Sequence, residues 1–319
     1  MEQSGRRASL SRIEEAVRAI DPVFLDTPQF ECEPLGDRLG ARLALKIETL
    51  NPIRSFKGRG TDLLVSRAEG GVRLVCASAG NFGQAMAYSC RRRGLALTVY
   101  ASTGANELKV ERMRALGAEV ILHGADFDAA KEEARRAARE EGARFVEDSL
   151  DVETLEGAGT MAPEWLRFPE PLDALLVPLG NGAMFNGVAR VMKVRSPGTE
   201  MVVVQAAGAP AMVESWRAGR RVVHDRMDTI ADGIGVRVPV PQALEDMRGL
   251  VDDAVLVGED SIIEAMRLIH RHAGVVSEPS GAVGVAAMLE KPEKFRDRLV
   301  GTTVCGGNLT PQQMRDWLW

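Results

Sequence analysis

The sequence has little of what stabilises secreted or membrane proteins. It contains four cysteines in 319 residues, and none of them form a CxxC pair, so neither a disulfide framework nor a zinc site is predicted. No apolar run reaches the roughly 18 residues that a membrane-spanning helix needs. The amino-terminal stretch MEQSGRRASLSRIEE lacks the apolar core of a signal peptide. We therefore expect a cytoplasmic protein without a membrane partner.

An excess of charge of one sign is also missing. The formal net charge is −5, from 40 Lys and Arg against 45 Asp and Glu, which gives no strong field for a nucleic acid or a membrane surface. The arginines at 91–93 stand just before Gly94, where a helix is predicted to end and where cations suit the helix dipole. The histidines share no metal-ligand spacing with acids or cysteines. A small molecule is therefore the expected partner, with no nucleic acid.

What the sequence does have is a regular alternation of short runs rich in Val and Leu with helical patterns that end at glycine. Strands that alternate with helices of about ten to fifteen residues indicate βαβ units and a parallel sheet. The predicted strands are 73–79, 95–102, 118–124 and 143–148 in a first series, and 173–179, 200–207 and 298–305 in a second. The predicted helices are 81–93, 105–116, 126–142, 182–195, 260–273, 280–290 and 310–318.

Two domains follow from this organisation. With 45% apolar residues, the chain is long enough for two cores. We predict an α/β fold of two doubly wound parallel-sheet domains, the first inserted into the second. Residues 1–53 plus 146–319 form the large domain, and residues 54–145 form the small one.

Three loops after predicted strands combine glycine with small polar residues. They are SAGNFGQ (78–84), GNGAMFNG (180–187) and CGGN (305–308). Ligands in open parallel sheets bind at the carboxyl ends of strands, where such loops lead into helices. Alone, each has an ordinary alternative: a helix cap at Ser78 or Asn81, a tight turn without a ligand at 180–187, and a small buried residue at Cys305.

The loop GNGAMFNG suits an anion. It opens a predicted helix, so its backbone amides and the helix dipole can bind a phosphate. A dinucleotide fingerprint GxGxxG would need glycine where Phe185 stands, and the Walker pattern is absent. Nucleotide binding is therefore not favoured.

The stretch RSFKGRG (54–60) crowds one lysine, Lys57, beside an aromatic ring and between two arginines. An amine near other cations in a partly desolvated pocket becomes available as a nucleophile and base. A crowded lysine together with a phosphate site and glycine-rich loops indicates that Lys57 forms a Schiff base with a carbonyl group.

Six segments, SFKGRG, SAGNFGQ, VPLGNGAMFNG, TIADG, SEPSGA and CGGN, in this order and at these separations, resemble the fold-type II pyridoxal-phosphate enzymes, specifically the serine/threonine dehydratase branch. The resemblance runs from Thr27 to Asn308. It implies a tryptophan-synthase-β-like architecture, pyridoxal 5′-phosphate as cofactor, an amino-acid substrate and a homo-oligomer, either a dimer or a tetramer.

The resemblance implies roles residue by residue. Lys57 binds the cofactor covalently, and Ser78 joins it as a catalytic residue. Phe56 lies along the cofactor ring, Asn81 bonds its phenolic oxygen, and Cys305 faces its pyridine nitrogen. The implied phosphate loop is Gly180, Asn181, Gly182, Ala183 and Met184, and the implied loop for the substrate carboxylate is Ser78, Ala79, Gly80, Asn81 and Phe82.

Two departures concern the loops. Asn181 and Ala183 stand where the family usually has glycine, so either Ala183 has a negative φ or the phosphate loop is reshaped. Phe82 replaces a frequent histidine, which makes that part of the pocket more apolar.

Two further departures concern the chemistry. Ala79 replaces the serine that related racemases use as a base on the opposite face, and a methyl group cannot move a proton, so racemisation is not favoured. Gln205 and Ala211 stand where relatives with a divalent-cation site have acidic residues, so no metal is expected.

The expected activity is β-elimination of a β-hydroxy amino acid such as L-threonine or L-serine to a 2-oxo acid and ammonia. A neutral thiol at Cys305 leaves the cofactor ring a weaker electron sink, which favours prompt loss of a β-substituent. Glu278 matches a glutamate near the same end of the ring, or is an acid that complements a helix dipole. The alternatives are β-replacement, a threonine-synthase-like reaction, or a non-catalytic protein that binds the cofactor or an amino acid.

Overall fold

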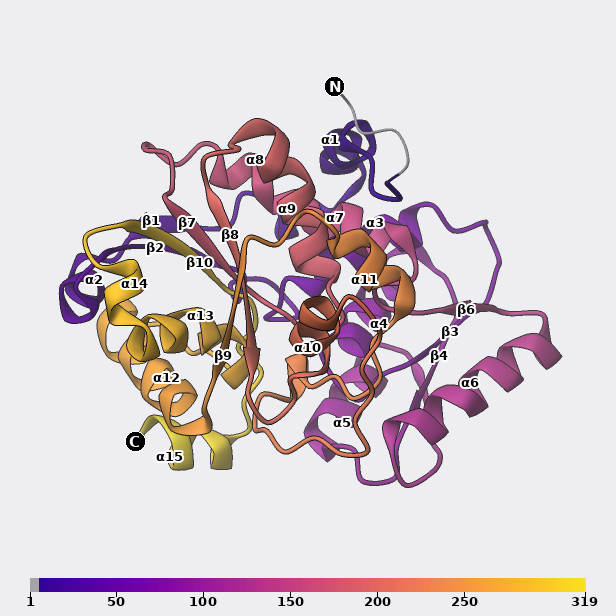
Figure 1. Ribbon diagram of the computed structural model, residues 1–319. Helices are drawn as coiled ribbons and strands as arrows, with labels where there is room; N and C mark the ends of the chain where they lie inside the picture. The colour runs from indigo at the N-terminus through magenta and orange to yellow at the C-terminus, as the bar shows by residue number, and fades with distance from the viewer. Residues whose placement is uncertain (1–5) are drawn as a thin grey trace.

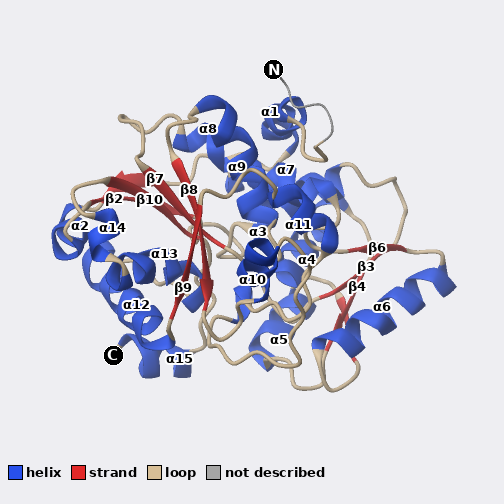
Figure 2. Cartoon of the chain, in the orientation of Figure 1, coloured by secondary structure: helices blue, strands red, loops and turns tan. Residues whose placement is uncertain are grey.

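The computed structural model describes residues 6–319, which form two sheets with helices around them (Figures 1 and 2). The strands of the larger sheet are β1 (Gln29–Glu31), β2 (Arg42–Ile47), β7 (Ala174–Pro178), β8 (Glu200–Ala206), β9 (Asp253–Val257) and β10 (Leu299–Val304). Their spatial order is β1-β2-β10-β7-β8-β9. Every neighbouring pair is parallel except β1 with β2, which is antiparallel.

The smaller sheet is parallel throughout, in the order β5-β4-β3-β6. Its strands are β3 (Leu74–Ala77), β4 (Leu97–Ala101), β5 (Glu119–Leu122) and β6 (Arg144–Val146). The helices that follow its first three strands are α4 (Asn81–Arg93), α5 (Glu107–Ala115) and α6 (Phe127–Glu141). Charged residues cover the outer face of α6, while Ala130, Ala134 and Ala137 are buried against the sheet.

The larger sheet is covered on both faces. Alternate strand residues point to opposite faces, so Val202 and Val204 join one apolar cluster while Met201 and Val203 join the other. The helices outside the smaller sheet are α1 (Leu10–Ala19), α2 (Glu33–Leu39), α3 (Lys57–Ser66), α7 (Val152–Gly159), α8 (Met161–Trp165), α9 (Ala183–Arg195), α10 (Ala211–Ala218), α11 (Pro241–Met247), α12 (Glu259–Ala273), α13 (Pro279–Glu290), α14 (Pro292–Phe295) and α15 (Pro311–Leu318). Short 3-10 turns lie at Pro22–Phe24 and Asp232–Ile234.

The structure confirms the predicted α/β class and places a strand or helix in every predicted segment. Three strands, β1, β2 and β9, were not predicted, and β1 is antiparallel, which corrects the expectation of wholly parallel sheets. The predicted border between residues 145 and 146 falls inside β6, which pairs with β3. The smaller sheet therefore extends across that border, and the domain division otherwise stays a prediction. None of the helices within residues 6–319 is long and apolar enough to cross a membrane.

The molecule has two halves, one around each sheet. Helix α3 joins them, because it packs against α4 of the smaller half and against α7 outside it. The loops that follow β3, β6, β7 and β10 lead toward this junction, which brings the three glycine-rich loops around the start of α3.

Candidate functional site

Lys57 is the first residue of α3, and the segment before it is tied to the segment after β10. Ser55 forms an isolated bridge with Gly306, and the Phe56 amide donates to the Cys305 carbonyl at 3.0 Å. The Lys57 ammonium donates to Asp148 Oδ2 at 2.6 Å and lies 4.7 Å from the centre of the Phe56 ring. The lysine and Cys305 are therefore held near each other although about 250 residues separate them.

A narrow cavity lies beside the lysine. Its lining residues are Phe56, Lys57, Gly60, Thr61, Phe82, Asp148, Thr154 and Ala183. The cavity brings together four predicted site residues from three loops. The other four lining residues were not predicted: Gly60, Thr61, Asp148 and Thr154. One signal could have found Asp148, because it follows strand β6, which pairs with the strand that leads to Ser78.

The loop between β7 and α9 has the geometry of an anion site. Gly182 adopts φ 89°, a left-handed conformation that favours glycine. Ala183 begins α9 and is not among the residues with positive φ, so the first of the two alternatives for this alanine holds. The first amides of α9 have no acceptor within the helix and can bind a negatively charged group. Asn181 adds a buried side-chain oxygen with no partner among the described residues.

Asn81, at the start of α4, is fixed by residues from the other half of the molecule. Its amide nitrogen donates to Glu278 Oε1 at 2.7 Å, and its carbonyl oxygen accepts from the Asn308 side chain at 2.9 Å. Glu278 also accepts from the Asn308 backbone amide at 3.0 Å. A carbon atom at the Cβ position of Gly306 would lie 2.3 Å from Glu278 Oε1, so glycine is required there. The second N–H of Asn81 is left for a ligand.

Glu278 is a buried carboxyl group with unusual acidity. Burial raises the pKa of Glu278 to about 7, and repulsion from Asp232 adds to this, while Lys109 and the hydrogen bonds from Asn308 and Asn81 act in the opposite direction. Glu278 also occupies the N-cap position of α13. The structure thus places this acid at a helix start, without a side-chain cap hydrogen bond, while its place near the cofactor ring stays a prediction.

The pKa of Glu278 predicts a pH-dependent stability. Its folded value of about 7 lies above its ordinary value of 4.5, so the native protein keeps this proton where the unfolded chain has lost it. The contribution is full below about pH 4.5 and is lost as the pH rises toward 7. Between pH 5 and pH 8 the free energy of unfolding should fall by roughly 2–3 kcal/mol more in the wild type than in Glu278→Gln. Urea unfolding at both pH values measures this, and an equal fall in both proteins would contradict it.

Cys305 is buried at the end of β10. Burial raises the pKa of the Cys305 thiol far above its ordinary value, and the nearby Glu278 carboxylate adds to the shift. The thiol is therefore neutral and donates to the Ser280 carbonyl, with an S···O distance of 3.6 Å. The Ser280 hydroxyl is buried without a partner among the described residues. This end of the site thus offers neutral donors and no fixed positive charge.

Ser78 has a capping function in the structure. Its hydroxyl oxygen accepts from the amides of Gly80 and Gly83 at 3.1 and 3.0 Å. The N-cap residue of α4 is Gly80, rather than Ser78 or Asn81, so Ser78 satisfies an amide of the first turn from outside the helix, while its catalytic role stays a prediction. Ala79, Gly80 and Asn81 are half-buried, whereas Phe82 is buried. The short backbone segment before α4 is thus accessible to a carboxylate.

These residues fit the cofactor that the sequence implies. An amine lies in a cavity, unpaired helix amides lie beside it, Asn81 provides a directed neutral donor, and Cys305 provides a neutral thiol. No group of three or more His, Cys, Asp and Glu that could hold a metal ion is found among residues 6–319; the expectation that no metal is needed stays a prediction.

Comparison with known proteins also supports the implied cofactor. The family model described as "Pyridoxal-phosphate dependent enzyme" matches residues 20–306. An L-threonine ammonia-lyase of Thermotoga maritima is 34% identical over 304 residues, which are 94% of this chain and 76% of that protein. The crystal structure of a threonine deaminase from T.th. has a TM-score of 0.89 at 31% identity, covering 95% of this chain and 99% of that one. Maize serine racemase has a TM-score of 0.90 at 26% identity, covering 97% and 96%.

Proposed function

The chain belongs to the pyridoxal-phosphate dependent enzymes, and from that membership we propose that it is an ammonia-lyase that converts a β-hydroxy amino acid such as L-threonine or L-serine to a 2-oxo acid and ammonia. The observation that carries the proposal is the Lys57 amine in a cavity beside the first amides of α9. The similarity to threonine ammonia-lyase and threonine deaminase supports the reaction type.

In this proposal the residues that hold pyridoxal phosphate come from both halves of the molecule. Lys57 would bind its aldehyde carbon, and the amides of Gly182, Ala183 and Met184 would hold its phosphate. The second N–H of Asn81 would be the donor for its phenolic oxygen, and Cys305 would be the residue at its pyridine nitrogen. When bound, the cofactor supplies the electron sink that stabilises negative charge at the substrate α-carbon.

The chain's own residues then position the substrate and move a proton. The backbone amides after Ser78 bind the α-carboxylate, which orients the α-hydrogen toward Lys57. The free Lys57 amine takes that hydrogen as a base. Phe56 and Phe82 line the cavity and exclude water from it. The neutral Cys305 thiol does not hold a positive charge on the ring nitrogen, which favours early loss of the β-substituent.

Elimination is proposed over racemisation because of Ala79. The likeness to maize serine racemase extends over nearly the whole fold, but the methyl group of Ala79 cannot act as a base. We also propose an amino acid as the small-molecule partner and a homo-oligomer, a dimer or a tetramer, as the assembly.

A substrate panel tests the proposal. The cofactor-supplied protein is incubated with L-threonine, L-serine and other β-substituted amino acids, without an added nucleophile, and ammonia and 2-oxo acid are measured. Equal amounts of both products are expected from at least one substrate. A product that forms only with an added nucleophile would indicate β-replacement, and a D-amino acid without oxo acid would indicate racemisation. A spectral change with no product would indicate a binding protein.

A further inference from the structure

Asp148 is an acidic side chain of the cavity to which the proposed function gives no role. Its Oδ2 accepts from the Lys57 ammonium at 2.6 Å. Its Oδ1 is buried and has no hydrogen-bond partner among the described residues. One oxygen of this carboxylate is therefore open to a further donor.

The acids next to Asp148 in the chain are used differently. Glu147 forms ion pairs with Lys131 and Arg135 on α6, and Asp151 pairs with Arg144. Within residues 6–319, the ion pair with Lys57 is the one that involves Asp148. Glu147 and Asp151 thus connect elements of the smaller half, whereas Asp148 faces the cavity.

The sheet register places Asp148 beside the proposed substrate loop. In the parallel pair of β3 and β6, Cys76 lies opposite Val146. Ser78 and Asp148 each follow two residues later, so the two loops leave the same edge of the sheet side by side. Phe82, the last residue of the substrate loop, lines the same cavity as Asp148. An amino acid whose carboxylate is bound by residues 78–82 therefore has its side chain within reach of Asp148.

The surroundings of Asp148 make its charge selective. Apart from Lys57, the cavity is lined by Phe56, Phe82, two threonines and small residues, none of which is a cation. Because the proposed reaction uses Lys57 as a neutral base, the substrate complex has no ammonium opposite the carboxylate. A substrate that brings its own positive charge, or a strong donor, then replaces that partner, while an anionic side chain is repelled.

We propose that Asp148 is a specificity-determining residue that favours amino acids whose side chain carries an amine over those with an apolar or anionic side chain. A β-hydroxyl, which donates one hydrogen bond, ranks between them, so a β-amino group is the preferred β-substituent. This inference rests on the proposed function, because it requires the amino acid to bind at the cofactor in this cavity.

The test uses ligands that lack a β leaving group, so that binding is measured without turnover. L-2,4-diaminobutyrate and L-norvaline have side chains of the same length and differ in a terminal ammonium or methyl group. Dissociation constants are read from the cofactor absorbance of the holoenzyme. The wild type should bind the diamino acid at least about tenfold more tightly, and Asp148→Asn should reduce that preference to about twofold or less. The matched control Glu147→Gln should keep the full preference for the diamino acid. Asp148→Glu, which conserves the charge, should keep part of it.

Three outcomes overturn the inference. An equal loss of affinity for both ligands in Asp148→Asn would mean that Asp148 only positions Lys57 or contacts the α-amine that all amino acids share. A wild type that binds both ligands equally well would also exclude a specificity role for Asp148, and this measurement does not depend on the folding of any variant. Borohydride reduction followed by peptide mass spectrometry distinguishes a failure of this inference from a failure of the proposed function. A pyridoxyl adduct on Lys57 without ligand preference contradicts this inference alone. A missing adduct contradicts the proposed function and this inference with it.

Discussion

Lys57→Ala is expected to lower the rate of elimination by at least about a thousandfold and to remove the covalent attachment of the cofactor. The side chain has two uses in the proposed reaction, since it binds the aldehyde carbon and then acts as the base for the α-proton. Alanine can do neither. The amides of α9 and the Asn81 network do not depend on this side chain, so the variant should still bind the cofactor without a covalent bond, and more weakly.

Two measurements check this expectation. Borohydride reduction of the native holoenzyme should place a pyridoxyl mass on the peptide that contains Lys57, and the variant should show none. Lys131→Ala is a suitable control, because Lys131 is also a half-buried lysine in an ion pair but lies on α6. The control should keep its adduct and its turnover. Retained turnover in Lys57→Ala, or an adduct on another lysine of the wild type, would contradict the proposed role.

The parts of the fold that the sequence predicted well are those with local signals. Helix α4 was predicted at 81–93 and is observed as Asn81–Arg93, because its end is marked by Gly94 in the left-handed conformation. Strand β2 was missed although Leu43, Leu45 and Ile47 are buried. Its sequence RLALKI contains Lys46, which is fully buried, and a lysine inside a strand reads as an exposed position. Its carboxylate partner, Glu164, lies more than a hundred residues further along the chain.

The candidate site shows the same limit. The segments that line it could be found because loops rich in glycine follow predicted strands, yet the pairings across them could not. Asp148 meets Lys57 only because β6 lies beside β3, and Asn81 meets Glu278 across the junction between the two sheets. Arg59 lies between Glu48 and Glu164, the second of which is more than a hundred residues further along the chain. Such contacts depend on the order of strands, which hydrophobic periodicity does not reveal.

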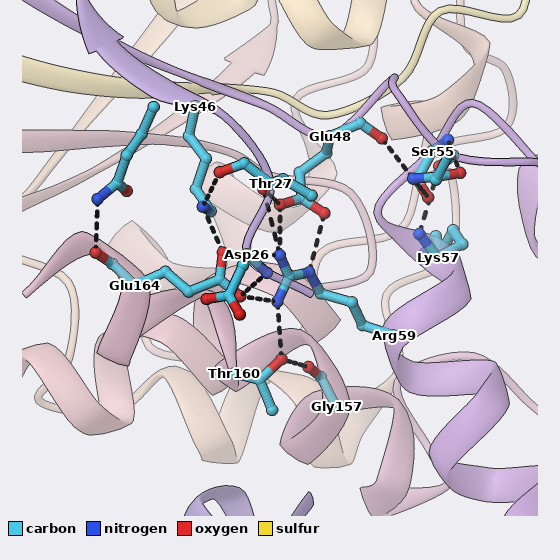
Figure 3. Close-up of polar contacts among 12 residues, drawn as sticks. Asp26, Thr27, Lys46, Glu48, Ser55, Lys57, Arg59, Gly157, Thr160 and Glu164 are labelled. Atoms are coloured by element: carbon cyan, nitrogen blue, oxygen red, sulfur yellow. Dashed lines mark hydrogen bonds and ion pairs between the residues drawn. The ribbon is translucent and has the colours of Figure 1, made fainter. Parts of the chain in front are cut away.

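Arg59 is the centre of a buried ionic network near Lys57 (Figure 3). Its guanidinium group is fully buried and donates to both oxygens of Glu48 at 2.8 and 2.9 Å and to both oxygens of Glu164 at 2.6 and 3.0 Å. Thr160 accepts a further bond at 3.0 Å. Lys46 lies 2.5 Å from Glu164 on the other side. Because Arg59 stands two residues after Lys57, this network connects the start of α3 to β2 and α8.

The electrostatics of the network depend on this one cation. Burial alone would raise the pKa of Glu164, but the hydrogen bonds and charges of Arg59 and Lys46 hold it below its ordinary value. Burial lowers the pKa of Lys46 in spite of the attraction of Glu48 and Glu164. Lys46 is thus a weaker cation than Arg59 in this place. Two buried carboxylates would have to share it if the arginine were removed.

Arg59→Met should therefore lower the free energy of unfolding by about 3–5 kcal/mol, since it leaves buried carboxylates without their partner. Arg59→Lys should recover only part of this loss, because an ammonium cannot make two bidentate contacts. Urea unfolding measures both. The control is Arg136→Met, whose ion pairs with Glu133 and Glu140 lie on the exposed face of α6, where water and salt screen them, so it should change stability far less.

The pH dependence of that loss separates unpaired charge from poorer packing. If the penalty in Arg59→Met comes from uncompensated carboxylates, acid should reduce it, because a buried carboxyl group that takes up a proton no longer needs a cation. The difference between wild type and variant should then be smaller at pH 5 than at pH 8. A difference that does not change with pH would assign the effect to the missing contacts of the guanidinium. In either case the start of α3 loses its attachment to β2 and α8, so the variant should also release the cofactor faster, while Arg136→Met should not.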